Sequence, residues 1–282
     1  MRKIIVIGEC ALDIIFPQST DSDEVTARVV PAGRLLNGAA ALGDMGHTVT
    51  FMGETGRDFT GDLITGFLER HGVETRSIDR YTGATTPVNL IQGSDTSGAI
   101  CMRSFPEDDF DDIWPRVDEG DIIVFGSFFA ISARSRKRLM EFLSHCNERK
   151  AIIMYLPGFL PGQSRRITHE MPLLLENLET ADIVITRTED LKTIFKSEDD
   201  EAVYRRHIDF YCRPMINFDR QSSELHFFYG KERVSRHVEG DPDSLKLNSL
   251  IMAHIADRLI AEKVTKEGLD SLDIDKMERI IS

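Results

Sequence analysis

The sequence lacks the features that would place it in a membrane or on nucleic acid. No window approaches the ~20 consecutive apolar residues that a transmembrane helix requires. Basic residues are in the minority: 34 Lys and Arg stand against 47 Asp and Glu, which gives a formal net charge of −13. Because nucleic acids and anionic membranes are bound through basic surfaces, this charge argues against both as partners.

The N-terminal stretch also lacks the marks of a signal peptide. The segment MRKIIVIGECALDIIF begins with basic residues and continues with apolar ones, as a signal peptide would. However, Glu9 and Asp13 interrupt the apolar run, and the run has no small-residue cleavage site. We therefore interpret IIVIG as a buried first strand.

Cysteine is scarce and widely spaced. The chain has four cysteines, Cys10, Cys101, Cys146 and Cys212, and they form no C-x-x-C pair. This spacing argues against a metal or disulfide framework, so we expect reduced thiols and a cytoplasmic location. The motifs of a Walker loop, a zincin and a Rossmann dinucleotide turn are absent as well, and so is any internal repeat.

The sequence does contain an alternation of apolar, strand-like runs and amphipathic, helix-like stretches. Continuous apolar strands separated by helices favour an α/β fold with a mostly parallel sheet covered on both faces. The expected strands are Lys3–Gly8, Thr48–Gly53, Asp121–Phe125, Ala151–Tyr155, Asp182–Thr186 and Pro214–Phe218. The expected helices are Leu35–Gly46, Gly61–His71, Ala133–Asn147, Met171–Leu178 and Thr188–Phe195, followed by 241–262 and 267–281.

Two segments depart from this alternation. Val25–Val30 carries alternating β-prone residues, and Thr86–Phe105 has the pattern of a hairpin, with TPVNLIQ, GSDTSG and AICMRSF in turn. No helix separates these strands, so we expect them to form a small sheet that covers a pocket. We place these lid strands at approximately 17–31 and 84–105, inserted in a single domain that spans 1–282.

The most informative stretch is AGRLLNGAAALGDMGHTVTFMGETGRDFTGD, residues 32–62. A glycine-containing turn leads into a helix of small residues, a strand follows, and then comes G-x-D-x-x-G at Gly56–Gly61. In these features the chain resembles the ribokinase-like, or PfkB, family of carbohydrate kinases, whose Gly-Gly-x-x-x-Asn-x-Ala element binds the sugar. The resemblance extends over nearly the whole chain. It implies a three-layer α/β/α fold with a mostly parallel central sheet and a small β lid.

The resemblance also implies three substrate-binding residues. Asp13 matches the carboxylate after the first strand that bonds sugar hydroxyls, Gly33 matches one of the paired glycines, and Asn37 matches the sugar-binding asparagine. A carboxylate and an amide suit a polyol, because each hydroxyl both donates and accepts. Without the resemblance, Asp13 is better explained as a turn or cap residue, and Asn37 as a helix-start residue.

The family's phosphoryl-transfer turn, V-D-T-T-G-A-G-D-A-F, is poorly matched here. Aligned without gaps, it corresponds to Val238–Leu247, which places Leu245 at the position of the catalytic base and Pro242 in the anion hole. Leucine cannot accept a proton, and proline has no N–H to donate. A gapped alignment instead places Asp241 at the base position, followed by Pro242 at the first helical position. We favour the alignment without gaps, and the second stays open.

Other family motifs on the nucleotide side have also changed. The N-x-x-E motif of the metal and phosphate network corresponds to Arg187-Thr188-Glu189-Asp190. The glycine-rich nucleotide turn corresponds to 216–222, which contains no glycine, and the D-P-N-x-R segment reads LPGFL at 156–160. Together these changes indicate a degraded ATP site.

Our leading hypothesis is therefore a PfkB-family sugar-kinase homologue that binds a small sugar or polyol and transfers phosphate weakly or not at all. The alternative is an active ATP-dependent carbohydrate kinase that uses Asp241 as its base, with ATP and Mg²⁺ as cofactors. In the leading hypothesis no cofactor is expected. A nucleoside kinase is less favoured, because nothing in the sequence specifies a purine pocket, and a structural role with a homodimer formed through the lid is a further possibility.

Overall fold

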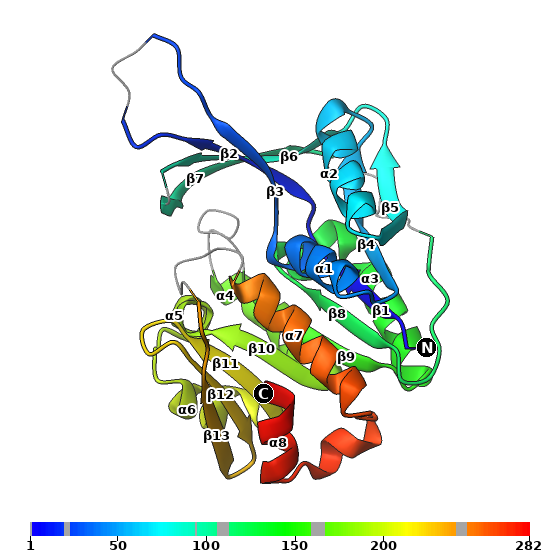
Figure 1. Ribbon diagram of the computed structural model, residues 1–282, viewed down its shortest axis with the longest axis vertical. Coiled ribbons are helices and arrows are strands. Elements are labelled where there is room, and N and C mark those ends of the chain that lie inside the picture. The colour runs from blue at the N-terminus through cyan, green and yellow to red at the C-terminus, as the bar shows by residue number, and fades with distance from the viewer. Residues whose placement is uncertain (1, 20–22, 94, 106–112, 159–166, 241–246) are drawn as a thin grey trace.

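The computed structural model describes residues 2–19, 23–93, 95–105, 113–158, 167–240 and 247–282. Within these residues the chain forms a large central sheet flanked by helices and a smaller sheet that stands off one end (Figure 1). The central sheet has the strand order β13-β12-β11-β10-β9-β8-β1-β4-β5. Its strands are β1 (Ile4–Ile7), β4 (Val49–Gly56), β5 (Val73–Tyr81), β8 (Ile122–Gly126), β9 (Ile152–Leu156), β10 (Ile183–Arg187), β11 (Pro214–Asp219), β12 (Glu224–Tyr229) and β13 (Glu232–His237).

The central sheet is parallel from β5 to β11 and antiparallel at the edge formed by β12 and β13. All of the strands expected from the apolar runs are confirmed, with ends that differ by at most a few residues. The sequence pattern missed β5, β12 and β13. At β13 only Val234 is buried, so this edge strand carries no apolar alternation that could have revealed it.

Helices cover both faces of the central sheet, which confirms the three-layer α/β/α fold. Ile4 and Val6 of β1 pack in one buried cluster, whereas Ile5 and Ile7 pack in another on the opposite face. This is the expected result of alternate side chains in a strand that is buried on both sides. The first cluster includes α1 (Arg34–Asp44), α2 (Phe59–Arg70), α7 (Leu247–Ala261) and α8 (Ile274–Ile281), and the second includes α3 (Ala133–Glu148), α4 (Ile167–Thr180), α5 (Thr188–Phe195) and α6 (Asp200–Val203).

The prediction of one continuous helix at 267–281 is wrong. The segment Glu267–Ser271 is a 3₁₀ turn, Leu272 is extended, and α8 begins only at Ile274. Asp273 causes the break, because its side chain accepts a hydrogen bond from the Lys276 backbone N–H at 2.8 Å and so caps a new helix. The helix expected at 241–262 is present from Leu247, and its first residues lie outside the described residues. None of the described helices is both long and apolar enough to span a bilayer.

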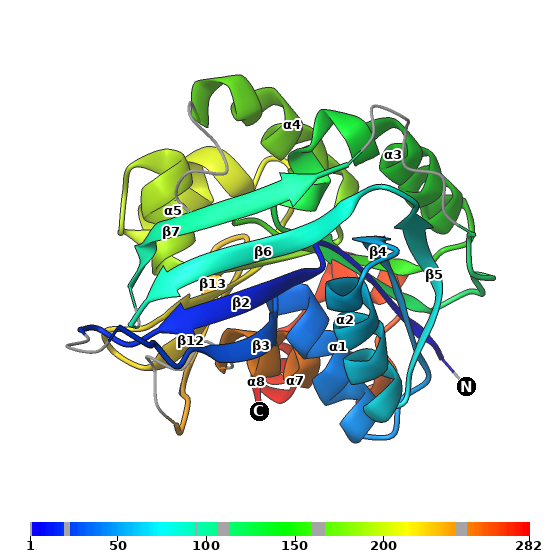
Figure 2. The same ribbon diagram turned by 90° about the horizontal axis from the view of Figure 1, so that it is seen from above.

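The smaller sheet has the order β3-β2-β6-β7 and lies over one end of the body (Figure 2). Its strands are β2 (Ala11–Phe16), β3 (Arg28–Ala32), β6 (Thr85–Gln92) and β7 (Asp95–Ser104). The predicted lid is therefore confirmed, although the strand expected at Val25–Val30 lies at Arg28–Ala32, and two further corrections are needed. First, β2 belongs to the lid and pairs in parallel with β6, although the sequence pattern had placed no lid strand before residue 17. Second, β7 starts at Asp95, so the hairpin turn is shorter than GSDTSG.

The chain direction sets where a ligand can bind. β1 lies between β8 and β4, so the sequence order of the strands reverses at β1. In open parallel sheets, ligands bind outside the carboxyl ends of the strands at such a switch point. The lid sheet begins directly after β1, and it covers this end of the body (Figure 1).

Candidate functional site

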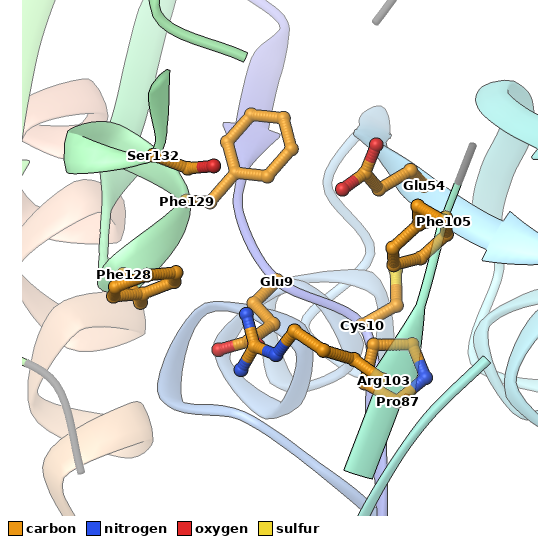
Figure 3. A pocket seen from close by; sticks show the side chains of 9 residues that line it. All are labelled: Glu9, Cys10, Glu54, Pro87, Arg103, Phe105, Phe128, Phe129 and Ser132. Atoms are coloured by element: carbon orange, nitrogen blue, oxygen red, sulfur yellow. The ribbon is translucent and has the colours of Figure 1, made fainter. Parts of the chain in front are cut away.

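A cavity lies between the lid and the carboxyl ends of β1, β4 and β8 (Figure 3). It contains about 280 Å³ of space free of protein atoms, part of it open to solvent. Only about 20 Å³ of it is open to the centre of a water-sized sphere, little more than one water molecule needs, so a larger ligand would have to displace the lid or the lining side chains. The lining residues are Glu9 and Cys10 after β1, Glu54 in β4, Pro87, Arg103 and Phe105 in or after the lid strands, and Phe128, Phe129 and Ser132 after β8.

An ion pair joins the lid to the body across this cavity. Arg103 of β7 places Nη2 2.5 Å from Glu9 Oε1. The same guanidinium lies over the ring of Phe128, with its Cζ 4.9 Å from the ring centroid (Figure 3). Because the partners come from the lid and from the body, the pair holds the lid in its position over the cavity.

A second ion pair supports the floor of the cavity. Arg134 of α3 donates from Nη2 to Glu54 Oε2 at 2.5 Å, and its guanidinium lies over the rings of Tyr81 and Phe105. Burial raises the pKa of Glu54, and the hydrogen bond from Arg134 opposes this rise. Burial also raises the pKa of the Cys10 thiol, with Glu54 adding to the effect, so Cys10 is a neutral lining group.

The underside of the lid carries a row of side chains fixed by strand register. Asp13 of β2 pairs with Val30 on one side and with Asn89 on the other, and Asn89 pairs with Cys101 of β7. Asn89 Nδ2 donates to Asp13 Oδ1 at 2.8 Å. Burial raises the pKa of Asp13, and the Asn89 hydrogen bond partly offsets this. The underside of the lid therefore presents the Asp13 carboxylate and the Asn89 amide, which are hydrogen-bonded to each other.

The turn into α1 brings the backbone close to the end of β1. Gly33 has φ 125°, a conformation that favours glycine, and an added Cβ would lie 3.1 Å from the Glu9 carbonyl oxygen. One turn later, Asn37 donates from Nδ2 to the Gly33 carbonyl at 3.1 Å. Gly33 thus allows the close approach of α1 to β1, and Asn37 stabilises the first turn.

A buried cluster of charges, centred on Asp190, lies where α1 meets the end of β10. Arg187 donates to Asp190 through Nε at 2.9 Å and Nη2 at 2.6 Å, and Arg34 donates through Nη1 at 2.8 Å and Nη2 at 3.4 Å. Arg34 Nη2 also donates to the Pro157 carbonyl at 2.8 Å. An added Cβ at Gly158 would collide with Arg34 and Asp190, so glycine is required beside the cluster.

The electrostatics of this cluster follow from its burial. The Asp190 side chain is 4% exposed, and burial alone would raise its pKa, but Arg187 and Arg34 hold the pKa below its usual range. Burial and the neighbouring Arg187 lower the pKa of Arg34. Two guanidiniums therefore share one ionised carboxylate.

Comparison with known families identifies the chain. The family model described as pfkB family carbohydrate kinase matches residues 1–208. The chain belongs to the PfkB family of carbohydrate kinases. Among curated proteins, ribokinase from Bacillus subtilis (strain 168) is 30% identical over 105 residues, which is 34% of this chain and 36% of the ribokinase. The matched region thus spans little more than a third of that relative.

Solved structures of fructokinases and of a riboside kinase share the fold over about nine tenths of their length. A double mutant of fructokinase from Vibrio cholerae O395, with fructose, ADP and potassium ion bound, has a TM-score of 0.80 at 14% identity and covers 100% of this chain and 90% of its own. Aminoimidazole riboside kinase from Salmonella enterica has a TM-score of 0.75 at 15% identity, with coverage of 100% and 90%. Fructokinase from Xylella fastidiosa has a TM-score of 0.74 at 18% identity, with coverage of 100% and 91%. At these identities the likeness concerns the fold alone.

The residues implied by the PfkB resemblance lie around the cavity, but not on its lining. Asp13 is on the lid, Gly33 and Asn37 are at the start of α1, and none of them lines the cavity. The sequence reasoning missed Glu9, Arg103 and the other lining residues, which no family motif marks. The alternation of β6 and β7 could have placed Asn89 and Arg103 on the covered face of the lid.

The Arg187–Asp190 segment does not fit the Mg²⁺ network that the PfkB family implies. A carboxylate offers about four acceptor positions, and the donors of Arg187 and Arg34 make four hydrogen bonds to Asp190. Mg²⁺ needs free oxygen ligands in octahedral geometry, and two adjacent guanidiniums repel it. The other motif positions in question, Asp241, Pro242 and Leu245, lie outside the described residues.

The counterpart of the glycine-rich nucleotide turn is a closed hairpin turn between β11 and β12. Asp219 accepts hydrogen bonds from the Gln221 backbone N–H at 3.0 Å and from Ser222 Oγ at 2.9 Å. Asn217 is fully buried; its Oδ1 accepts a hydrogen bond from Thr186 Oγ1, and its Nδ2 donates one to Asp200 Oδ2. The side chains of Asn217, Asp219 and Ser222 are thus engaged within the protein.

Proposed function

We propose that this chain is a PfkB-family protein that binds a small sugar or polyol under its lid and transfers phosphate from ATP weakly or not at all. The observation that carries the second part is the cluster at Asp190. At the N-x-x-E position this carboxylate is saturated by Arg187 and Arg34. A kinase that transfers phosphate from ATP needs a carboxylate that is free to hold the metal ion beside the phosphate groups.

The cavity under the lid supports the first part of the proposal. Its carboxylates and Arg103 offer acceptors and donors for hydroxyl groups, and its phenylalanine rings offer apolar surface for a sugar face. Asp13 and Asn89 lie on the same covered side of the lid. The fructose bound to the Vibrio cholerae fructokinase makes fructose the first sugar to test, and the ribokinase relative makes ribose the second.

The alternative function is an active ATP-dependent carbohydrate kinase in which Asp241 is the base. It is favoured by the placement of Asp241 before a proline at the start of a helix-like stretch. The two functions differ in their response to Asp241→Asn. In the alternative, this substitution abolishes turnover, whereas in our proposal there is little turnover to lose.

Separate calorimetric titrations test the proposal. We expect a sugar from a panel of hexoses, pentoses and polyols to bind without ATP, and we expect Mg-ATP to bind weakly or not at all. Asp241→Asn should leave the sugar affinity within twofold of the unmodified protein. Tight binding of Mg-ATP together with rapid turnover would favour the alternative function, and absence of binding by every sugar would reject the pocket assignment.

We also propose a cytoplasmic protein that forms a homodimer through the lid. The outer face of β7 exposes Ile100 and Met102, and β3 exposes Val29, which is an apolar surface on a small sheet. Exposed apolar patches are common sites of protein–protein contact, so a second lid packed on this face would stabilise both.

A further inference from the structure

The cavity under the lid is almost filled by the side chains that line it. The room left inside is little more than a single water molecule needs. A sugar is many times larger than water, so at least one lining side chain has to move before a sugar can enter. The contacts of the lining residues indicate which side chain this is.

The side chains on the floor of the cavity are firmly held. Glu54 accepts a hydrogen bond from Arg134, whose guanidinium lies over the rings of Tyr81 and Phe105. Cys10 is buried in the core below the lid. Because Phe105 directly follows β7, its contact with Arg134 also holds the end of this lid strand on the body. Moving any of these groups would break packing or hydrogen bonds inside the protein.

Arg103 is held less firmly than the floor. Its guanidinium contacts Glu9 and the face of Phe128, and the side chains of the ion pair are 31% exposed for Arg103 and 17% exposed for Glu9. An ion pair that water reaches adds little net stability. An arginine side chain also has several rotatable bonds and gains conformational entropy when it is released. Arg103 is therefore the lining group that can leave the cavity most readily while the strand stays in place.

Arg103 also stands between solvent and the inner part of the cavity. It comes from the lid strand β7 and reaches across to Glu9, which follows β1 (Figure 3). Cys10, the next residue along the chain, lines the same cavity but is only 1% exposed. The partly exposed guanidinium thus marks the outer side of the cavity, and the buried thiol marks its inner side.

From this arrangement we infer that Arg103 is a gate residue: while paired with Glu9, its side chain fills the space that a sugar would take, and a sugar enters only after this pair has opened. The gate is the swing of one side chain, and the lid itself stays in place over the body. After opening, the guanidinium and the carboxylate are available to donate to and accept from the hydroxyl groups of the sugar. The apparent affinity for the sugar is lowered in proportion to the fraction of molecules in which the gate is open.

This inference rests on the proposed function, because the cavity that Arg103 closes is the proposed sugar pocket. The two fail separately, since opening of the gate is measured without any sugar. If the gate opens as expected and no sugar binds, the pocket assignment fails and the gate stands. If a sugar binds and the gate measurement fails, the pocket stands without a gate.

Alkylation of Cys10 by iodoacetamide measures the opening. Mass spectrometry of the peptides gives the labelling rate of each of the four cysteines separately. We expect slow labelling of Cys10 in the unmodified protein and labelling at least tenfold faster in Arg103→Gln. Loss of a nearby positive charge by itself disfavours the reactive thiolate and would slow the reaction. Faster labelling therefore reports access to the cavity.

The chain offers controls for this measurement. Arg28→Gln changes an exposed arginine of the lid strand β3 that does not line the cavity, so it should leave the labelling of Cys10 unchanged. Cys146 and Cys212 are buried elsewhere in the core, so their labelling reports unfolding of the whole protein.

A second variant covers the case in which Arg103→Gln is unstable. Arg103→Lys keeps the charge and loses the planar guanidinium, and we expect it to speed the labelling of Cys10 by a smaller factor than Arg103→Gln. An unchanged labelling rate of Cys10 in the folded variants would overturn the inference. Equal acceleration at Cys10, Cys146 and Cys212 in both variants would overturn it as well, because Arg103 would then only stabilise the fold.

Discussion

At the scale of single residues, the most consequential feature is one carboxylate shared by two arginines. The sequence alone showed that Arg187 departs from the family motif, but it did not show that Arg34 joins the same carboxylate from 156 residues away. No local pattern encodes such a contact, because periodicity reports only which face of an element is buried. The fold brings the start of α1 to the end of β10, and this creates the cluster.

The first prediction concerns the stability that this cluster provides. Asp190→Asn should lower the free energy of unfolding by about 3 kcal/mol, because it leaves two half-buried guanidiniums without the carboxylate that they share. Urea denaturation followed by circular dichroism measures the change. Glu201→Gln removes a carboxylate from an exposed pair with Arg205 and should cost less than about 1 kcal/mol. Equal effects of the two substitutions would contradict the account of the cluster.

The second prediction concerns the polar row under the lid. The family resemblance implies that a sugar reaches from the cavity to Asp13 in this row, so Asp13→Ala should weaken the binding of an identified sugar about fivefold or more, since loss of one buried polar contact costs about 1–3 kcal/mol. Calorimetry provides the affinity. Asp44→Ala, an exposed carboxylate paired with His71, is the matched control and should change nothing. An unchanged affinity in Asp13→Ala would show that the lid carboxylate does not contact the ligand.

At the scale of elements, the sequence predicted the long periodic segments and missed those without a pattern. The parallel strands are continuous apolar runs, and their helices carry clear apolar stripes, so both were found. β2 was missed because ALDIIF follows the first strand after a short break and reads as its continuation. The break before α8 was missed because the side-chain cap of Asp273 competes with a helical pattern that continues on both sides.

The third prediction concerns how α6 is held to the central sheet. His226 of β12 lies between Asp200 of α6, at 2.5 Å from Nδ1, and Glu224, at 3.1 Å from Nε2. Burial alone would lower the pKa of His226, and Arg233 also lowers it, but the hydrogen bonds to Asp200 and Glu224 raise it overall. Burial would raise the pKa of Asp200, but the bond to His226 lowers it overall.

The pH dependence follows from these directions. A raised histidine pKa contributes stability that is complete below about pH 6.5 and is lost as pH rises through the folded-state pKa. The unmodified protein should therefore lose stability as pH rises above about 6.5, and His226→Gln should lose less over the same range.

A depressed pKa of Asp200 adds stability that is lost as pH falls through its folded-state value, and His226→Gln should reduce that loss as well. Thermal melts from pH 2 to 9 measure both slopes, with the exposed pair variant His71→Gln as control. If the melting temperatures of the unmodified protein and of His226→Gln changed with pH in the same way, this account would be contradicted.

At the scale of the whole molecule, the lid and the body form one site from distant parts of the chain. Arg103 and Glu9 close the cavity from opposite sides, and the motifs of the sequence indicated neither. The sequence did predict a lid from strands that break the strand–helix alternation. The site residues predicted from the sequence came from motifs near the N-terminus. They lie near the cavity, but they do not line it.

The fourth prediction concerns assembly. If the exposed apolar face of the lid pairs with a second copy, light scattering should give twice the mass of one chain. The double substitution of Ile100 and Met102 by Glu should then give the mass of one chain, because charges would be buried at the interface. Phe210→Glu changes a side chain that is 90% exposed and lies outside the lid, so it should leave the dimer intact. A monomeric unmodified protein would contradict the proposed dimer.

The central claim is that this PfkB-family chain retains a sugar pocket and has lost efficient phosphate transfer. A coupled assay of ADP release, with ATP, Mg²⁺ and each sugar shown by calorimetry to bind, tests this claim most directly. Loss of a general base alone costs on the order of 10²–10⁴ in rate, and loss of each preorganised anion donor costs on the order of 10²–10³. We therefore predict turnover well below about 1 s⁻¹, the low end of typical enzymes, with every sugar that binds. Sugar-dependent turnover above that rate would contradict the claim.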